Sequence, residues 1–251
     1  MTSSHDNFDL INVAGKGGVV LVCEHASNLI LDEYKNLGLD DAALQSHIAW
    51  DIGAFNVAKT LSKLLDAPLI APSVSRLIYD CNRPADAKSA IPTKSEVYDI
   101  PGNVDLDDGE RKDREDKFYK PYRKALVDIL DRAKNEGDAP VLITIHSFTP
   151  VFEGQKRLLD LGILHNVDTR MADLLLDVLE KDGNLTARRN DPYGPAHGVT
   201  YTLSEHAEPR GLLNVMIEIR NDLILDEAAQ QNMGKQLATY IKAALNQGGT
   251  S

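Results

Sequence analysis

The sequence predicts a single α/β domain with a mostly parallel or mixed sheet that is flanked by helices. Short apolar runs typical of buried strands alternate along the chain with longer segments of helical periodicity. The 251 residues, 43% of them apolar, are enough for one large core or at most two modest ones. Because no repeat, low-complexity tract or linker divides the chain, we expect one domain over residues 18–245, with a flexible leader over 1–17 and a flexible tail over 246–251.

The first half of the chain contains the first predicted strands and an amphipathic helix. Residues 19–23 predict a buried strand, and residues 52–65 predict a helix because their apolar positions recur at helical spacing. Residues 68–81 predict a short strand and then a second extended run. The loop 91–103 is interrupted by Pro and Gly and is long enough to serve as a lid or a binding loop.

The second half of the chain continues the same alternation. Residues 106–137 predict a long helix with a solvated, charged first half and a kink or break at Pro121. The remaining predicted elements are a strand over 141–147, a short strand near 159–165, a helix over 168–181, a strand near 185–190, a loop over 191–198, a strand over 212–222 and a helix over 227–245.

Charge and cysteine usage limit the class of protein. The net charge is −11, and no stripe of Lys and Arg appears, which argues against a nucleic-acid partner or an anionic membrane surface. No apolar run reaches the roughly 18–20 residues that span a bilayer. Cys23 and Cys81 lie in apolar runs and suit buried free thiols in a reducing compartment. We therefore expect a cytoplasmic monomer or homodimer that acts on a small molecule.

Polar side chains gather where the predicted strands end. They are Glu24 and His25, then Asp80, Asn82 and Arg83, then His146 and Ser147, and finally Glu218 and Arg220. Such groups are costly to bury without partners. If the strands are parallel, these groups meet at the edge of the sheet where open α/β sheets bind ligands. Glu218 and Arg220 also share one face of their strand, because side chains alternate along a strand.

This combination of residue types suits a zinc hydrolase with an anionic substrate. Imidazoles and a carboxylate hold Zn²⁺, and the ion lowers the pKa of a bound water to roughly 7. A second carboxylate takes the proton of that water, and Arg and Asn bind an anion and the developing oxyanion. Each residue alone also has a structural interpretation: a histidine at a strand end is structural more often than ligating, and Asp80 with Arg83 could be a structural ion pair. The four groups together favour a site.

Six blocks of the sequence together resemble the N-formylglutamate amidohydrolase family. The blocks are VCEHASN, SRLIYDCNRP, IPGN, TIHSFTP, NDPYG and IEIRND, and they occur in the family's order over about residues 18–222. The resemblance implies a phosphorylase/hydrolase-like α/β fold, related to zinc carboxypeptidases and aspartoacylase, and a divalent metal ion with Zn²⁺ as first choice. It also implies hydrolysis of an N-acylated acidic amino acid, with N-formyl-L-glutamate cleaved to formate and glutamate as first choice.

The resemblance assigns roles to particular residues. His25 and His146 resemble the histidine ligands of the metal, and Glu218 resembles the general base. Asn82 and Arg83 resemble the pair that binds the substrate, and Arg83 would stabilise the oxyanion together with the metal.

The third metal ligand stays open. The resemblance implies a Glu three residues after His25, but Asn28 stands there. Glu24 is the first choice for the carboxylate ligand, and Asp51 is its rival. His47 and Asp51 are four residues apart at the start of a predicted helix, so they are also candidates for a pair that orients a ligand.

Two more residues are candidates for substrate binding. Arg220 is a candidate partner for a substrate carboxylate, and Tyr193 is a candidate to line the pocket from the loop 191–198.

An aspartoacylase-like deacylase or a small carboxypeptidase would use the same site on another substrate. A metal-free α/β binding protein is the non-enzymatic alternative, and the missing Glu at position 28 is its main support.

Overall fold

The structure is a computed structural model and describes residues 2–5, 7–137 and 139–249. Its centre is an eight-stranded sheet with the order β1-β2-β4-β3-β7-β12-β10-β11. The strands of this sheet are β1 (Thr2–His5), β2 (Phe8–Ile11), β3 (Val19–Val22), β4 (Leu69–Pro72), β7 (Val141–Phe148), β10 (Leu161–Leu164), β11 (Ala187–Arg189) and β12 (Asn214–Arg220). The four central strands β4, β3, β7 and β12 are parallel, whereas β2 is antiparallel to β4 and β10 is antiparallel to β12. The predicted α/β class with a mixed sheet is confirmed.

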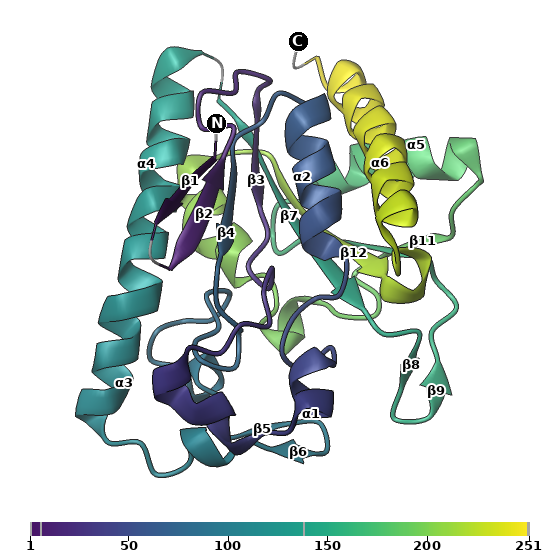
Figure 1. Cartoon of the computed structure of the whole chain (residues 1–251). Coiled ribbons are helices and arrows are strands. Elements are labelled where there is room, and N and C mark those ends of the chain that lie inside the picture. Colours follow the sequence, from purple (N-terminus) through teal and green to yellow (C-terminus); the bar gives the residue numbers. More distant parts are fainter. Residues whose placement is uncertain (1, 6, 138, 250–251) are drawn as a thin grey trace.

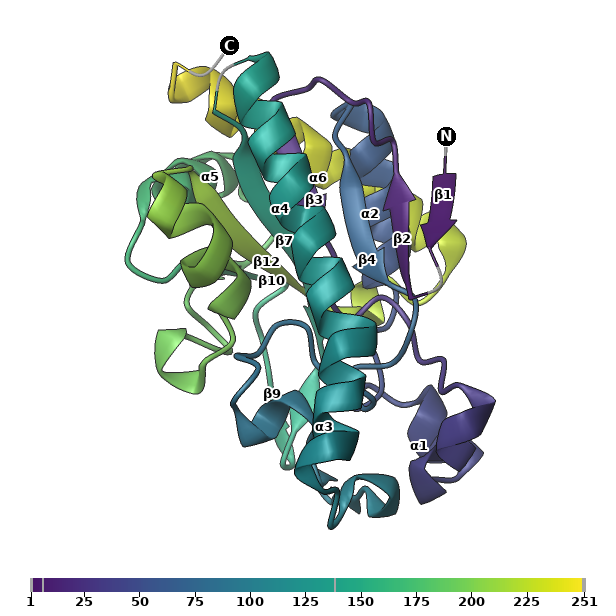
Figure 2. The same ribbon diagram turned by 90° about the vertical axis from the view of Figure 1, so that its left-hand side faces the viewer.

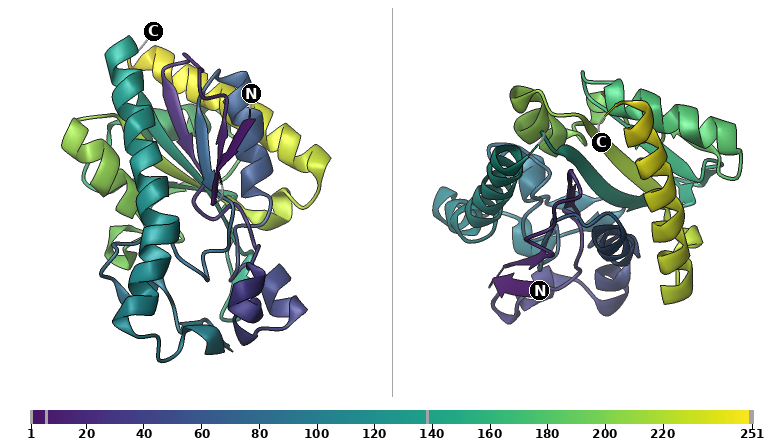
Figure 3. Two further views of the ribbon diagram at one scale, coloured as in Figure 1. Left: turned by 60° about the vertical axis from the view of Figure 1, so that its left-hand side comes forward. Right: turned by 90° about the horizontal axis from the view of Figure 1, so that it is seen from above.

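Helices cover both faces of the sheet, as Figures 1, 2 and 3 show. They are α1 (Asp41–Gln45), α2 (Ala54–Leu64), α3 (Asp108–Arg114), α4 (Lys120–Glu136), α5 (Arg170–Asp182) and α6 (Glu227–Gln247). Helices α2, α5 and α6 pack on one face and α4 on the other, and each face has its own buried apolar cluster. Strand β7 supplies both clusters, with Ile143 and Ile145 on the first face and Leu142 on the second. Over the described residues, no helix combines the length and the apolarity that crossing a membrane requires.

The parallel strands end on one side of the molecule, where the long connections gather. Figure 1 shows α1 and two small hairpins below the strands. These hairpins are β5 (Lys94–Ser95) with β6 (Tyr98–Asp99), and β8 (Val151–Phe152) with β9 (Gln155–Lys156). The loop 91–103 that the sequence marks as a lid or binding loop contains the first of them. The carboxyl ends of β3, β7 and β12 therefore face a group of loops that can enclose a ligand.

The segment expected to be a flexible leader contains two strands of the sheet. Strand β2 pairs with β4 over four residues of each strand, from Phe8 opposite Pro72 to Ile11 opposite Leu69. Phe8 is buried, and its ring lies 6.4 Å from the ring of Tyr122 on α4. The segment joins the sheet because it pairs the edge of β4 and adds apolar contacts to the core. In the expected tail, α6 continues to Gln247, and residues 250–251 lie outside the described part of the chain.

Two other sequence predictions differ from the structure. The second extended run within 68–81 is not a strand: the sheet takes only β4, and the chain after it forms turns. The long helix has no break at Pro121, because a π-helical turn over Glu115–Tyr119 joins α3 to α4, and Pro121 lies in the first turn of α4 (Figure 2). A widened turn suits this position, because proline has no N–H group for the regular hydrogen-bond pattern.

Candidate metal and active site

A cavity of about 180 Å³ opens at the carboxyl ends of the parallel strands. Its wall includes the ends of β7 and β12, the turn after β3, the turn before α2, the segment after β4 and the hairpin β5–β6. The lining residues are His25, His47, Ile48, Asp51, Arg76, Asn82, Arg83, Ser95, Glu96, His146, Ser147, Phe148, Thr149, Tyr193, Val199, Met216 and Glu218. The parallel pairing explains the convergence: His146 on β7 lies directly opposite Glu218 on β12.

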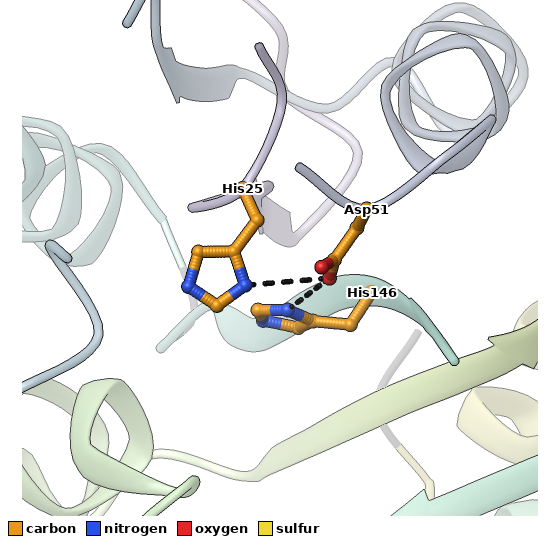
Figure 4. A group of neighbouring side chains, drawn as sticks. All are labelled: His25, Asp51 and His146. Atoms are coloured by element: carbon orange, nitrogen blue, oxygen red, sulfur yellow. Dashed lines mark hydrogen bonds and ion pairs between the residues drawn. The ribbon is translucent and has the colours of Figure 1, made fainter. Parts of the chain in front are cut away.

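Two histidines and an aspartate form the centre of the cavity (Figure 4). Oδ2 of Asp51 lies 2.8 Å from Nδ1 of His146 and 3.4 Å from Nδ1 of His25. The ligand atoms of these three buried residues lie within 4.8 Å of one another, and no other group of this kind occurs among the described residues. Two imidazoles and a carboxylate are the ligand types that zinc prefers. We call these residues the His-Asp-His group.

Local backbone structure places Asp51 between the two histidines. The backbone N–H of Asp51 donates to the carbonyl of His25, and Oδ2 accepts from the backbone N–H of Ser147 at 3.2 Å. Gly53 follows with φ +81°, and a Cβ there would meet the carbonyl oxygen of Ile224 at 2.5 Å. The turn that presents Asp51 to the cavity therefore requires glycine at this position.

Each histidine of the group has a carboxylate at its other ring nitrogen. Nε2 of His25 lies 2.8 Å from Oδ1 of Asp80. Nε2 of His146 lies 2.9 Å from Oε2 of Glu24, a close ion-pair contact that lacks the angle of a hydrogen bond. Carboxylates behind histidine ligands are typical of metal sites, where they fix the ring orientation and raise ligand basicity. The residues therefore fit a divalent cation that His25, Asp51 and His146 would hold, with Glu24 and Asp80 behind the two histidines.

Glu24 does not lie where the sequence analysis expected it, as the carboxylate ligand of the metal. It is buried beside His146, but it is absent from the His-Asp-His group and from the cavity wall. Its neighbour in sequence, His25, lies in the cavity wall, because the chain forms a turn at these two residues after β3. The structure favours Asp51, the rival, as the carboxylate ligand.

The charges in this cluster compensate one another. Burial opposes ionisation of Asp51 and Asp80, but His25 lowers the pKa of both carboxyl groups, that of Asp80 well below its usual range. Burial likewise opposes the charged form of His146, but Glu24 and Asp51 raise its pKa well above the usual value. In the chain alone, the proton on His146 supplies a positive charge between two carboxylates. A metal ion held here would replace that proton, so its binding would weaken as the pH falls.

Arg76 is a site residue that sequence reasoning missed. One of its guanidinium nitrogens, Nη1, lies 3.1 Å from Nδ1 of His25 and 3.7 Å from Oδ1 of Asp51, and Nη2 donates to Asp80 at 2.8 Å. The guanidinium therefore reaches the His-Asp-His group, where it can bind a substrate oxygen that gains negative charge. Arg76 is the first arginine of the block SRLIYDCNRP. It was missed because the sequence predicted an extended run where the structure has a turn.

Asn82 and Arg83 border the cavity from the segment after β4. Asn82 is buried and fixed by its amide, which donates to the carbonyl of Val199 at 2.6 Å and accepts from the backbone N–H of Thr202 at 3.0 Å. Arg83 donates to the carbonyl of Gly198 and has Nε 3.6 Å from Oδ2 of Asp80. These contacts join the segment after β4 to the loop 191–198 and leave both side chains in the cavity wall.

Glu218 lies in the same cavity without an assigned partner. Its Oε2 atom is buried and has no hydrogen-bond partner among the described residues. Burial raises the pKa of Glu218 to about 7, against the effect of the His146 charge. It stands opposite His146 in the strand pairing but outside the His-Asp-His group. A carboxylate with a free oxygen and a raised pKa is suited to accept a proton during a reaction.

Arg220 does not take the place that its strand position suggested. Its guanidinium pairs with Asp222 at 2.7 Å and Asp160 at 3.1 Å, and it is absent from the residues that line the cavity. The strand ends at Arg220, so its side chain turns toward these aspartates.

His47 also differs from its predicted place. It lies in a turn and contacts Glu96 at 2.6 Å, so it does not form a helical pair with Asp51.

His206 is a buried histidine outside the cavity, and it predicts a pH effect on stability. Burial and the Arg123 guanidinium lower the pKa of His206 to about 4. The unfolded chain takes up a proton near pH 6.5. The stability contributed by neutral His206 is therefore complete above that pH and is lost as the pH falls toward 4, by at most about 3 kcal/mol. We expect His206→Gln to remove this dependence, so that urea unfolding shows the difference from wild type shrinking by about 2 kcal/mol between pH 7 and pH 5. A constant difference across this range would contradict the assignment.

Known proteins resemble this chain in sequence and in fold. The family model described as N-formylglutamate amidohydrolase matches residues 17–225. A solved structure of a gene product from Agrobacterium tumefaciens is similar, with 49% sequence identity, a TM-score of 0.94, and coverage of 97% of this chain and 96% of that chain. An N-formylglutamate amidohydrolase from Ralstonia eutropha shares the fold, with 18% identity, a TM-score of 0.56, and coverage of 95% of this chain and 99% of that chain. No match was found among curated proteins.

Proposed function

Because the chain belongs to the N-formylglutamate amidohydrolase family and is an amidohydrolase, we propose that it hydrolyses N-acylated acidic amino acids with the help of a divalent metal ion. The first-choice substrate is N-formyl-L-glutamate, which gives formate and glutamate, and the first-choice metal is Zn²⁺. The observation that carries the proposal is the His-Asp-His group in one cavity with Glu218, Asn82 and Arg83.

The roles of the residues follow from their positions. A cation held by His25, Asp51 and His146 would lower the pKa of its water and polarise the amide carbonyl of the substrate. Glu218, with its free oxygen, takes the proton from the attacking water and returns it to the leaving amine. Arg76, at the edge of the His-Asp-His group, binds the carbonyl oxygen as it gains negative charge, in place of Arg83, which the sequence resemblance gave this role.

The substrate carboxylate has a binding place on the other wall of the cavity. Asn82 and Arg83 lie side by side there, and a guanidinium binds a carboxylate through parallel hydrogen bonds. Arg220, which pairs with two aspartates, is left out of this role.

A cytoplasmic location is also part of the proposal, since Cys23 and Cys81 are both buried and free.

We expect Arg83→Lys to lower kcat/KM by roughly 10–100-fold, because a lysine cannot reproduce the paired hydrogen bonds of a guanidinium. Arg220→Lys is the matched control and is expected to keep kcat/KM close to wild type, since Arg220 lies outside the cavity wall. Both variants are assayed by release of free amine from N-formyl-L-glutamate. Equal turnover of uncharged N-acyl amides by the wild-type enzyme would argue against a carboxylate-binding Arg83.

The proposed function is tested by a screen of N-acyl amino acids with and without added Zn²⁺. The panel contains N-formyl and N-acetyl derivatives of glutamate, aspartate and glutamine, and release of free amine is followed. Metal-dependent hydrolysis that favours N-formyl-L-glutamate supports the proposal. Preference for N-acetyl-aspartate would indicate an aspartoacylase-like deacylase. Absence of hydrolysis and of bound metal would favour a binding protein that keeps the cleft.

A further inference from the structure

We infer that Arg157, a residue outside the cavity wall, fixes the hydroxyl group of Tyr193 as a hydrogen-bond donor that points into the cavity. Tyr193 then binds the substrate oxygen that gains negative charge during hydrolysis, and Arg157 is its positioning residue. The inference rests on the proposed function for the chemistry, but the geometry of the two side chains stands by itself.

Arg157 directly follows the hairpin β8–β9, which continues from the strand that carries His146. Its backbone N–H donates to the carbonyl of Pro150 at 2.8 Å, which closes the base of the hairpin. The side chain is absent from the cavity wall, whereas Phe148, Thr149 and Tyr193, which it contacts, line that wall.

The guanidinium of Arg157 packs among three aromatic rings. Its central carbon lies 4.6 Å from the ring centre of Phe152, 4.9 Å from that of Tyr193 and 5.7 Å from that of Phe148. Nη1 donates to Oη of Tyr193 at 3.1 Å and lies 3.4 Å from both oxygens of Thr149. Arg157 makes no salt bridge with a carboxylate among the described residues. Its positive charge therefore acts on the rings and on the phenol oxygen.

The direction of the Tyr193 hydroxyl follows from this contact. An arginine side chain has only donors, so the phenol oxygen must accept the hydrogen bond from Arg157. The hydroxyl hydrogen of a phenol lies preferentially in the ring plane, where it has two orientations. The N–H group of Arg157 favours the orientation in which the hydroxyl hydrogen of Tyr193 points away from Arg157. Within the described part of the chain, the Tyr193 hydroxyl has no acceptor. Since Tyr193 lines the cavity, the acceptor that fits is an oxygen of the substrate.

The surroundings of Arg157 favour a positioning role over direct binding of the substrate. The guanidinium is covered by rings that themselves form the cavity wall, and Arg157 is absent from that wall. It can therefore influence the reaction through Tyr193, by holding its ring and by polarising its O–H bond.

A double-mutant cycle measures this dependence. Tyr193→Phe is expected to lower kcat for N-formyl-L-glutamate by roughly 10–100-fold, because a hydrogen bond to developing charge is lost. Arg157→Met is expected to lower kcat by roughly 10-fold, and in the Tyr193→Phe background it should have almost no further effect. Lys156→Met, which removes a positive charge from the exposed neighbouring residue, is the matched control and should leave kcat unchanged. Effects of Arg157→Met and Tyr193→Phe that simply multiply would overturn the inference and indicate that Arg157 binds substrate directly.

A second readout needs neither substrate nor metal. The chain has eight tyrosines, which 3-fluorotyrosine replaces during expression, and the ¹⁹F resonance lost in Tyr193→Phe identifies Tyr193. Arg157→Met should shift and broaden this resonance, whereas Lys156→Met should not. An unchanged resonance in Arg157→Met would overturn the positioning role even if the enzyme hydrolyses N-formyl-L-glutamate. A shifted resonance in an enzyme that hydrolyses none of the panel would support the role while the proposed function fails.

Discussion

Glu218→Gln is expected to lower kcat by roughly 10²–10⁴, the range for loss of a general base, while metal and substrate bind about as well as in wild type. Glutamine keeps the shape of the side chain and removes its basicity. Glu218 faces His146 across the strand pairing and keeps Oε2 free of protein partners among the described residues. A carboxylate that coordinates a metal has its lone pairs engaged, whereas this one is available to accept a proton.

The measurements for Glu218→Gln are metal content, substrate affinity and single-turnover rate. Because burial raises the pKa of Glu218 to about 7 and a nearby cation would lower it, kcat/KM of wild type should fall as the pH drops through a value at or below 7. In the variant, most of the rate should be lost, and the contribution of Glu218 to this acidic limb should disappear. Loss of the metal would instead make Glu218 a ligand, and unchanged turnover would remove it from the mechanism.

His146→Ala is expected to lose the metal altogether. The ring contributes one ligand atom to the His-Asp-His group and contacts Asp51 on one side and Glu24 on the other. We expect metal affinity to fall by more than the roughly 10–100-fold that is typical when a residue behind a ligand is removed. His206→Ala is the matched control, because His206 is also a buried histidine but lies outside the group.

The same assay separates the two carboxylates that compete for the ligand position. Asp51→Asn should behave like His146→Ala, whereas Glu24→Gln should weaken metal binding by only about 10–100-fold. Metal content after dialysis and circular dichroism of each variant are the measurements. The ligand assignment fails if His146→Ala retains a full equivalent of metal, and the order of the two carboxylates reverses if Glu24→Gln has the larger effect.

Sequence reasoning predicted the parts of the fold that depend on local pattern. Apolar runs and helical periodicity located the central strands and the major helices, because burial on both faces or on one face imposes these patterns. The strands of residues 2–5 and 8–11 were missed because β2 is short and at most partly apolar, and only its pairing with β4 makes it a strand. Pairing partners distant in sequence leave no local signal.

In the candidate site, residue type was predictable and side-chain direction was not. His25, His146 and Glu218 all reach the cavity, as expected for the ends of parallel strands. Asp51 was harder to place, because it comes from the turn before α2 and its approach depends on tertiary packing. Arg220 shares a strand face with Glu218, but the chain turns after it, and nearby aspartates bind its guanidinium.

The strand order also determines when the cavity can be completed as the chain is made. Strand β3 pairs with β7, from Val19 opposite Val141, and β7 then pairs with β12. Such nonlocal pairing slows folding, because long loops must close before the contacts form. During synthesis, the segments that hold His25, Asp51 and His146 leave the ribosome before β12, which carries Glu218. Synthesis from the N-terminus therefore releases all three residues of the His-Asp-His group before Glu218, the residue that we propose as the proton acceptor.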